Sequence, residues 1–554
     1  MRAKGSSIDP ITLEVMRHAL MSVAEEMNAN LIRTASSPNI KERRDCSCAV
    51  FDARGEMVAQ AESIPVHLGA MPYSVEAAIQ ATTGGAAAER ADGSLAQGDV
   101  IVLNDPYAGG AHLPDVTFVA PVFVEERVVG FVANRAHHAD VGGREPGSLA
   151  GDTQEIFQEG LRIPPVRLWR RGRLQEDLLA LILLNVRTPD ERLGDLRAQH
   201  ASCRVGIERM RAVIDRYGLG RIEAGMSAIL DYSERRMRDA IEALPDGTST
   251  FEDALDDDGV SPEPVPLCVE VCIADDELTA DFTGSSPQVA GPINAVEAVT
   301  ASAVYYAVRA VTDPTIPPNG GCYRPIDIVA PGGSIVHPLP PAPVVGGNLE
   351  TAQRIVDVML GALGRLLPDR ALGACQGTMN NVAIGGIDPR NGRPYTLYET
   401  IGGGFGGRID RDGTDGIHSH MTNTLNTPVE ALEIAYPLRV ERYELRPGTG
   451  GDGRHRGGMG LRRDLKAIDH TARVSLLTER RTRRPYGVAG GEPGEPGKNV
   501  LLRDREEQAL PSKGSISLRA GETISIRTPG GGGFGPPRER DDAKRARDRR
   551  EERI

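Results

Sequence analysis

The first stretch of helical periodicity along the chain begins at Asp9. Asp9 is a favourable N-cap residue, and Pro10 suits the first helical position, where no backbone N–H is required. Apolar residues then recur every three or four positions from Ile11 to Leu31. The pattern predicts one long helix that packs one face on a core.

Short apolar runs replace this periodicity between residues 49 and 138. The runs AVFDARGEMVA, DVIVLND, VTFVAPVFV and RVVGFVANRAHH are broken by Gly, Pro and Asp, which is typical of strands joined by loops. Helical spacing returns in three segments between residues 174 and 244. We therefore predict a helix plus a sheet region in residues 1–170 and a helical segment in residues 171–246.

Glycine dominates three segments of the C-terminal half: GGGFGGR, GTGGDGRHRGGMG and TPGGGGFG. Glycine permits close backbone approach, and Gly and Pro supply 64 and 39 of the 554 residues, so much of the chain is expected in shaped loops. We predict a multi-lobed, loop- and glycine-rich α+β protein with mixed sheets and a central helical segment. Residues 247–537 would form a C-terminal α+β region, and residues 538–554 a charged, disordered tail.

Charge and cysteine content exclude several classes of function. The net charge is −13, so nonspecific attraction to nucleic acid or to an anionic membrane is not expected. The seven cysteines contain no CxxC pair, so neither a disulfide framework nor a cysteine zinc site is predicted. No apolar run approaches the ~20 residues of a membrane span, and no signal peptide is recognisable. We expect a cytoplasmic protein.

Nucleotide-binding and serine-hydrolase motifs are missing from the sequence. No GxxxxGK[ST] or GxSxG string occurs, and GGGFGGR precedes a polar loop rather than a helix. The sequence therefore does not predict nucleotide binding by this chain alone.

Histidine and aspartate concentrate in NDPYAGGAHLPDVTFV and ANRAHHADVGG. The residues concerned are His112, His137, His138, Asp105, Asp115 and Asp140. Imidazole and carboxylate groups together suit Zn, Mn or Fe, and no cysteine lies nearby to favour a softer metal. The composition is that of a metal site, although polar residues that simply satisfy one another at a sheet end remain the alternative.

The spacing of these segments predicts that they meet. VTFVAPVF and RVVGFVAN are expected to form a hairpin that turns at Glu125 and Glu126, which sets residue i opposite about 251 − i. Asp115 would then face Ala136, and His137 would face the residue before Asp115. Paired residues lie ~5 Å apart, so HLPD and RAHHAD should converge even if the register slips by one or two.

Only one of the two adjacent histidines can face such a site, because neighbouring strand residues point to opposite faces. We favour His137, with His138 supporting the site or contacting substrate. Weaker candidates lie elsewhere. Arg44 with Asp45 would bind a carboxylate or phosphate, or form a buried ion pair. Further candidates for substrate contact are His67, Asp105, His418 and His420, the last two sharing a face if their segment is extended.

At these residues the sequence resembles the hydantoinase B/oxoprolinase family, the B-type subunits of ATP-dependent hydantoinases, 5-oxoprolinases, lactamases and acetone or acetophenone carboxylases. The resemblance rests on DPITLEVMRHAL, IPVHLGAMPYSV, NDPYAGGAHLPD, HHADVGGREPGS, NGGCYRPI, GGNLETAQRI and the long NTLNTPVEALEIAYPLRVERYELRPGTGGDGRHRGGMG. It covers almost the whole chain outside the tail.

The resemblance implies a division of labour between two subunits. An A-type partner binds ATP with Mg and phosphorylates the substrate, and a hetero-oligomer is expected. The B-type chain carries a divalent metal, whose ligands fall by motif on His112, Asp115 and His137. A proton-transferring acid such as His138 or Asp140 would assist.

Three functions follow from the resemblance. The first is a metal-dependent hydrolase that opens a cyclic amide of the hydantoin, 5-oxoproline or lactam type after phosphorylation. The second is a subunit of an ATP-dependent ketone carboxylase; the length of the chain, shorter than expected of an acetone carboxylase large subunit, favours the hydrolase. The third is a non-catalytic scaffold that stabilises its partner, against which the presence of every candidate ligand argues.

Overall fold

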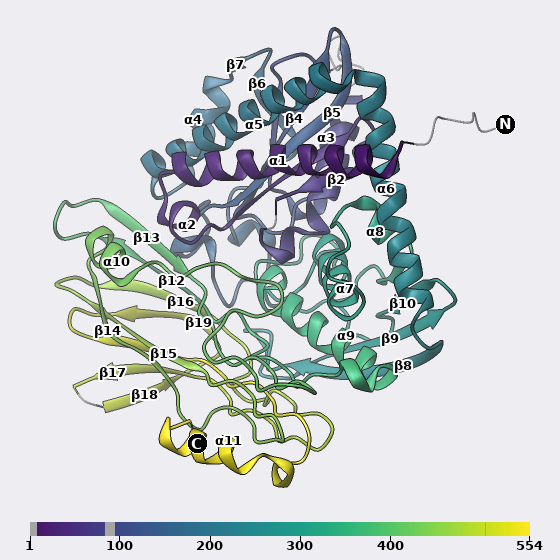
Figure 1. Cartoon of the computed structure of the whole chain (residues 1–554). Coiled ribbons are helices and arrows are strands. Elements are labelled where there is room, and N and C mark those ends of the chain that lie inside the picture. The colour runs from purple at the N-terminus through teal and green to yellow at the C-terminus, as the bar shows by residue number, and fades with distance from the viewer. Residues whose placement is uncertain (1–7, 62, 84–94, 505, 554) are drawn as a thin grey trace.

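The computed structural model describes residues 8–61, 63–83, 95–504 and 506–553 (Figure 1). These residues form helices and four sheets, which confirms the predicted α+β class. In Figure 1 the N-terminal part lies at the top and the C-terminal sheets lie at the lower left. Helix α6 (Leu219–Glu242) descends along the right side, where it contacts α1 and reaches β10 of the second sheet.

The N-terminal sheet has seven strands in the order β2-β1-β5-β4-β3-β6-β7, all paired antiparallel. Its strands are β1 (Cys46–Asp52), β2 (Met57–Gln60), β3 (Val100–Leu103), β4 (Asp115–Val124), β5 (Arg127–His137), β6 (Val166–Arg170) and β7 (Arg173–Leu174). Residues 115–123 of β4 and 129–137 of β5 are buried throughout, so these central strands are covered on both faces.

Helices cover the two faces of this sheet. They are α1 (Pro10–Thr34), α3 (Ala70–Thr83) and α5 (Pro189–Tyr217). Asn134 of β5 donates to the Gln199 carbonyl on α5 at 2.8 Å, whereas Arg135, pointing the other way, donates to Ser74 on α3 at 2.7 Å. Helices α1 and α5 pack on each other and on the face of the sheet toward which Asn134 points. The α3 side is the face toward which His137, two residues beyond Arg135, points.

The β4–β5 hairpin forms as predicted, with one difference in register. Beyond the turn, Val124 pairs with Arg127, as the predicted centre requires. A β-bulge between Val122 and Phe123 then shifts every later pair by one residue, so Asp115 pairs with His137 instead of Ala136. The bulge therefore places two of the candidate ligands directly opposite each other.

The predicted helices are confirmed in position. Asp9 caps α1 by accepting from the backbone N–H of Thr12 at 3.0 Å. The helical segment consists of α4 (Glu176–Leu184), α5 and α6. The later helices include α7 (Glu297–Val311) and α9 (Ala352–Leu366), with one π-helical turn at Gly347–Thr351 before α9. Short helices are α2 (Pro38–Lys41), α8 (Gly320–Tyr323) and α10 (Val429–Ala435).

A second sheet, in the order β11-β10-β9-β8, packs against α9. Its strands are β8 (Gly247–Leu255), β9 (Val265–Ala274), β10 (Glu277–Asp281) and β11 (Ile326–Val329). Apolar side chains of this sheet, of α7 and α9, and of the N-terminal sheet belong to one continuous core. The N-terminal and middle parts of the chain are thus packed together.

Two C-terminal sheets share a separate core. The first has the order β13-β12-β16-β19, and the second the order β14-β15-β20-β17-β18. Their strands are β12 (Asn381–Ile387), β13 (Pro394–Glu399), β14 (Leu438–Leu445), β15 (Leu461–Ala467), β16 (Ala472–Leu477), β17 (Lys498–Arg503), β18 (Glu506–Leu510), β19 (Lys513–Leu518) and β20 (Thr523–Arg527). Val382 and Leu476 of the first sheet and Leu465 and Ile524 of the second are buried in this core.

The three glycine-rich segments run beside one another and bond through their backbones. Gly407 donates to Gly532 at 2.8 Å, and Gly531 donates to Gly458 at 2.9 Å. A Cβ atom on Gly406 would lie 1.7 Å from the Gly373 carbonyl oxygen, so only glycine permits this approach. Glycine here serves close backbone packing, as the sequence predicted.

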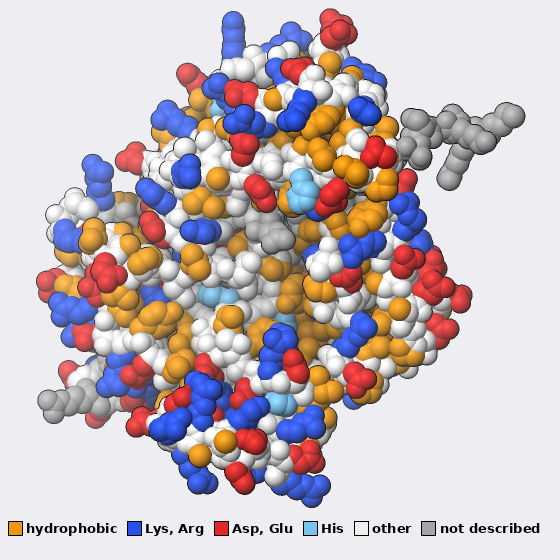
Figure 2. Space-filling model, in the orientation of Figure 1, with side chains coloured by type: hydrophobic (Ala, Val, Ile, Leu, Met, Phe, Trp, Pro, Cys, Tyr) orange, Lys and Arg blue, Asp and Glu red, His pale blue; other side chains and the backbone are white. Residues whose placement is uncertain are grey.

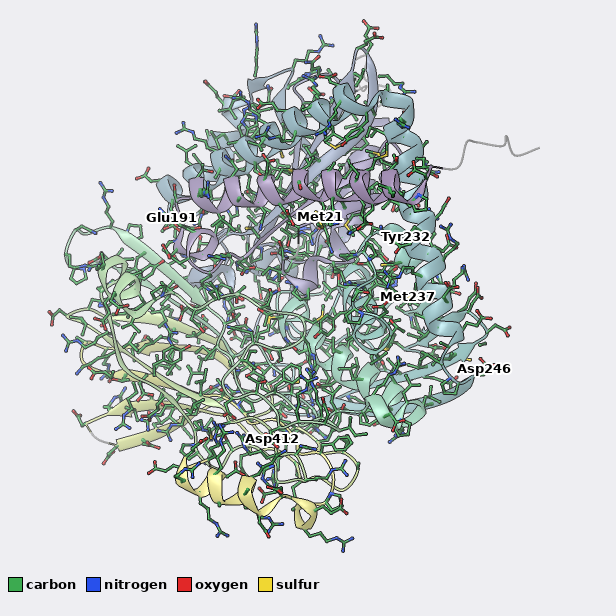
Figure 3. All side chains as sticks on the ribbon, viewed as in Figure 1. Met21, Glu191, Tyr232, Met237, Asp246 and Asp412 are labelled. Atoms are coloured by element: carbon green, nitrogen blue, oxygen red, sulfur yellow. The ribbon has the colours of Figure 1, made fainter. Side chains whose placement is uncertain are left out.

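The charged tail, expected to be disordered, instead contains helix α11 (Asp542–Arg550). Arg540 donates to Asp412 at 2.8 Å and to Asp548 at 2.7 Å, and Asp412 is labelled directly above α11 in Figure 3. Arg456 adds a 3.5 Å ion pair with Asp548. The tail has one apolar residue beyond its two alanines, but its charges meet opposite charges on the glycine-rich region, which sequence composition alone does not reveal.

The surface agrees with the composition. Figure 2 shows acidic and basic side chains interspersed over the visible face, with apolar side chains in small groups. Among the described residues, the helices include none that combines the length and apolarity of a membrane span.

Candidate metal centre

His112, Asp115 and His137 meet at the open end of the β4–β5 hairpin. His112 lies in the turn before β4, where its carbonyl accepts from the backbone N–H of Asp115 at 3.0 Å. Asp115 is the first residue of β4 and His137 the last of β5, and the two are paired. One ligand atom from each of the three residues lies within 4.8 Å of the other two. The predicted convergence of these segments is therefore present in the fold.

The three side chains are buried and two of their atoms lack partners. Among the described residues, neither His112 Nε2 nor Asp115 Oδ1 has a hydrogen-bond partner, although the two atoms lie 3.4 Å apart. Orphaned polar atoms at this depth cost free energy unless a further group satisfies them. A cation would satisfy the imidazole nitrogen and the carboxylate oxygen at once, so the residues fit a metal.

The orientation of His112 suits a ligand. Its Nδ1 atom lies 3.3 Å from the Val345 carbonyl oxygen, which can only accept, so Nδ1 carries the proton. Nε2 then presents its lone pair toward Asp115. Metal-ligating histidines are commonly held by this type of backbone contact.

The electrostatics also suit ligation. Burial opposes ionisation of Asp115, but the neighbouring His112 and His67 outweigh it and hold the pKa of Asp115 well below its usual range. Burial, reinforced by His112, lowers the pKa of His137 well below that of a free imidazole. An ionised carboxylate and a neutral imidazole are the forms that bind metal.

A layer of polar and aromatic residues holds His137 in place. The His137 ring stacks on Tyr398 of β13, with centroids 4.5 Å apart and an interplanar angle of 11°. Asn39 donates to the His137 carbonyl at 2.6 Å, and its amide nitrogen lies 3.2 Å from His137 Nδ1. The buried Arg43 donates to Asn39 and to the Tyr398 carbonyl. These contacts join the N-terminal sheet to the C-terminal region.

His67 and Asp45 also lie at the cluster. His67 Nε2 is 3.6 Å from Asp115 Oδ2, and its Nδ1 is 2.8 Å from the Ser47 hydroxyl. The Asp45 carbonyl accepts from the backbone N–H of His137 at 3.0 Å. Burial raises the pKa of the Asp45 carboxyl. His67 is therefore a further imidazole that lies beside the candidate ligands.

Four candidate residues lie elsewhere. Arg44 is exposed, with φ at 57°, while its neighbour Arg43 is the buried one. Asp105 pairs with Arg162 at 2.8 Å. His138 points to the opposite face of the sheet, with Nε2 2.9 Å from Gln199 on α5. Both carboxylate oxygens of Asp140 are taken by the Gly142 and Gly147 backbone and by Arg187. The structure does not bring these four to the cluster.

His418 and His420 do not form one face. His420 has φ at 50°, so its segment is not extended as the alternation argument assumed. Its Nδ1 lies 3.4 Å from the Tyr306 hydroxyl in a cavity apart from the metal centre. Both nitrogens of His418 are buried without a hydrogen-bond partner among the described residues.

Several residues at the candidate metal centre were not predicted from the sequence. Asn348, on the π-helical turn, donates to Asp115 at 3.4 Å, and Tyr398 lies under His137. Both are far from the hairpin in sequence, so no local signal points to them. Arg43 was not distinguished from Arg44, because the turn at residues 42–43 and the positive φ of Arg44 break the alternation that would separate two neighbours.

Comparison with known proteins finds relatives that match nearly the whole of this chain. The protein MJ0963 of Methanocaldococcus jannaschii, itself uncharacterized, is 42% identical over 96% of this chain and 92% of its own length. The 5-oxoprolinase 1 of Arabidopsis thaliana is 38% identical over 95% of this chain, which spans 42% of that longer protein. The chain thus matches one relative nearly end to end and corresponds to less than half of the other.

Two solved structures share the fold. The ATP-dependent caprolactamase from Pseudomonas jessenii superposes with a TM-score of 0.90 at 31% identity, over 99% of this chain and 94% of that chain. A nucleotide-free acetone carboxylase has a TM-score of 0.90 at 17% identity, over 98% and 78% of the two chains, which shows likeness of fold alone. Residues 9–537 match the hydantoinase B/oxoprolinase family. The chain therefore belongs to the hydantoinase B/oxoprolinase family.

Proposed function

We propose that this chain is the metal-containing B-type subunit of an ATP-dependent hydrolase that opens a cyclic amide of the hydantoin, 5-oxoproline or lactam type. The names of two relatives at 30% identity or more, a caprolactamase and a 5-oxoprolinase, support a cyclic amide as substrate. The acetone carboxylase, at 17% identity, supports the fold and leaves a ketone carboxylase as the alternative.

The observation that carries the proposal is the pair of orphaned atoms, His112 Nε2 and Asp115 Oδ1, beside His137. We assign these three residues as ligands of a Zn, Mn or Fe ion. Such an ion supplies Lewis acidity toward a carbonyl oxygen and lowers the pKa of bound water from 15.7 toward ~7.

The protein's own residues would orient the reaction. The Val345 carbonyl fixes the tautomer of His112, and Tyr398 and Asn39 fix the plane and position of His137. His67, 3.6 Å from Asp115, is better placed than His138 or Asp140 to move a proton at this centre. The surrounding burial excludes bulk water and strengthens each electrostatic interaction.

ATP with Mg would be bound by an A-type partner, because this chain lacks a phosphate loop. The partner would phosphorylate the amide oxygen to give an imidoyl phosphate, whose carbon is more electrophilic than that of the amide. Water would add to this carbon, the C–N bond would break as the nitrogen takes a proton, and hydrolysis of the resulting acyl phosphate would release phosphate. A hetero-oligomer is required for the whole reaction. The chain's near end-to-end match to MJ0963 and its partial match to the longer 5-oxoprolinase are consistent with separate and fused arrangements of such parts.

The test is reconstitution of this chain with its A-type partner. ATP-dependent ring opening would be measured with hydantoin, 5-oxoproline and caprolactam, against bicarbonate-dependent consumption of acetone or acetophenone. We expect opening of at least one cyclic amide and its loss in His112→Ala, while His18→Ala, at an exposed helical histidine, retains it. Ketone consumption would establish the carboxylase instead. Full activity of His112→Ala would favour the scaffold function.

A further inference from the structure

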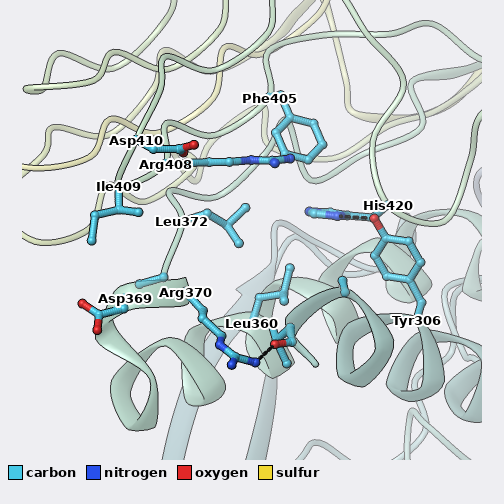
Figure 4. Close-up of a pocket in the computed structure, with 13 residues that line it drawn as sticks. Tyr306, Leu360, Asp369, Arg370, Leu372, Phe405, Arg408, Ile409, Asp410 and His420 are labelled. Carbon is cyan, nitrogen blue, oxygen red and sulfur yellow. Dashed lines mark hydrogen bonds between the residues drawn. The ribbon is translucent and has the colours of Figure 1, made fainter. Parts of the chain in front are cut away.

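A cavity lies away from the metal centre, between two helices and a glycine-rich segment. Its volume is about 350 Å³, within the ~300–1,000 Å³ range of small-molecule sites. The end of α7, helix α9 and residues 369–372 form one side, and residues 405–410 form the other (Figure 4). Leu360, Leu372 and Ile409 give it apolar walls.

An arginine that has no charged partner among the described residues lies along one wall of this cavity. Figure 4 shows the Arg408 side chain extended along one wall toward Phe405, and its guanidinium carbon lies 5.0 Å from the Phe405 ring centroid. No carboxylate lies within ion-pair distance of Arg408 in the part of the chain that the structure describes. Its backbone N–H is held by the Arg411 carbonyl at 2.9 Å. The Arg408 backbone is therefore held in place, while its guanidinium contacts the Phe405 ring.

Two further polar groups occupy the inner end of the cavity. The Tyr306 hydroxyl lies 3.4 Å from His420 Nδ1, and the His420 ring centroid lies 5.5 Å from that of Phe405. Burial and the nearby Arg408 lower the pKa of His420 to about 3, so the imidazole is neutral. His420 Nε2 has no hydrogen-bond partner among the described residues. The backbone of His420 adopts φ of 50°, in the left-handed region.

The distribution of charge along the cavity is uneven. In Figure 4, Asp369 and Asp410 lie at the end opposite His420 and Tyr306. Asp410 is exposed and pairs with Arg411 at 3.2 Å. The inner end therefore combines the Arg408 guanidinium with a phenol and a neutral imidazole, and because the last two bond to each other, one of them at a time can donate to a ligand. The buried Asp357 also lies there, with Oδ1 4.0 Å from His420 Nε2, and its carboxylate is paired with Arg480 at 2.6 Å.

We propose that this cavity binds a small molecule through an oxyanion, either a carboxylate or a phosphate group, with Arg408 as the cationic partner and Tyr306 as a second donor. The apolar walls formed by Leu360, Leu372 and Ile409 would hold the body of the ligand. A guanidinium fork is suited to bidentate contact with either anion.

The site stands apart from the metal centre but is joined to it by a short segment. Residues 421–425 follow His420, and the Met421 carbonyl accepts from the backbone N–H of Val66, next to His67. The Leu425 backbone N–H donates to the Arg43 carbonyl at 3.1 Å. Binding of an anionic ligand at Arg408 does not require a metal.

The test measures the binding of three probes to the whole purified chain. Each probe carries the same phenyl ring. Benzoate carries a carboxylate, phenyl phosphate carries a phosphate, and benzamide is the neutral control; titration would be followed by proton and phosphorus line broadening. The variants are Arg408→Gln, Tyr306→Phe and, as a matched control, Arg393→Gln, an exposed arginine in the β12–β13 turn.

We expect at least one anionic probe to bind the wild-type chain more tightly than benzamide does. Arg408→Gln should weaken that binding by at least ~10-fold and Tyr306→Phe by ~3-fold, while Arg393→Gln leaves it unchanged. Tighter binding of phenyl phosphate would identify a phosphorylated ligand, and tighter binding of benzoate a carboxylate. Anionic probes that fail to bind, or that bind Arg408→Gln as well as the wild type, would overturn the proposal. Because binding is measured without turnover, this failure is distinct from failure of the hydrolase.

Discussion

Replacing His112 by Ala should abolish most of the stabilisation that a divalent metal gives to the fold. A metal present at about 100 times its Kd stabilises the native state by about 2.7 kcal/mol. Changes in residues that merely support a ligand already weaken metal affinity by ~10–100-fold, so loss of a ligand should cost at least ~100-fold. At the same metal concentration the variant would then gain only about 0.4 kcal/mol.

The adjacent His138 provides a matched control on the same strand end. Its Nε2 lies 2.9 Å from Gln199 on the opposite face of the sheet, so His138→Ala removes a buried hydrogen bond without removing a ligand. That loss should cost ~1–3 kcal/mol equally with metal and with chelator. The metal-dependent difference in His138→Ala should therefore remain near the wild-type value of about 2.7 kcal/mol.

The assay is urea unfolding of each variant with added Zn, Mn or Fe and with chelator, alongside metal content by plasma mass spectrometry. The wild type and His138→Ala should carry about one metal per chain and His112→Ala far less. Equal unfolding free energies of the wild type with metal and with chelator would refute the assignment. So would loss of metal in His138→Ala with retention in His112→Ala.

Two further predictions concern the fold. Burial raises the pKa of Glu159 to about 8, whereas an unfolded Glu titrates near ~4.3, so between these values the native state holds a proton that the unfolded state has released. The unfolding free energy should fall as pH rises through this window, and Glu159→Gln should reduce that slope by up to ~1.4 kcal/mol per pH unit in urea unfolding; an unchanged slope would contradict it. Gly531→Ala, whose Cβ would lie 2.3 Å from the Phe405 carbonyl oxygen, should cost ~1–3 kcal/mol or more, whereas Gly220→Ala, exposed in α6 with nothing within 4 Å, should gain ~0.5–1 kcal/mol; equal thermal midpoints would refute the close packing of glycine.

The local pattern of apolar and polar residues was sufficient to predict the elements that hold the candidate ligands. The apolar periodicity and the cap at Asp9 located α1, and the alternating runs located the two strands of the hairpin. Strand parity predicted that only one of His137 and His138 faces the site, and the bulge then placed His137 on the side of the sheet that holds Asp115. These features depend on residues close in sequence, whose geometry is set by the period of helix or strand.

Local pattern could not supply the β-bulge or the distant partners. The bulge at Val122 and Phe123 lies in a run of apolar residues that fits either register, and it alone sets Asp115 opposite His137. Tyr398 reaches His137 only because the C-terminal region packs against the N-terminal sheet. The charged tail likewise forms helix α11 where Arg540 binds Asp412, a residue far from it in the sequence.

The sequence by itself determined the family and the α+β class, because these depend on residue identity and short-range spacing, and the family resemblance implied the three candidate metal ligands. Only the tertiary structure decided which of the other polar residues join them. It brought in His67, Asn348 and Tyr398, and it separated His138 and His420 from the centre. The physical reason is that long-range packing fixes register and burial, and a side chain's chemistry depends on both.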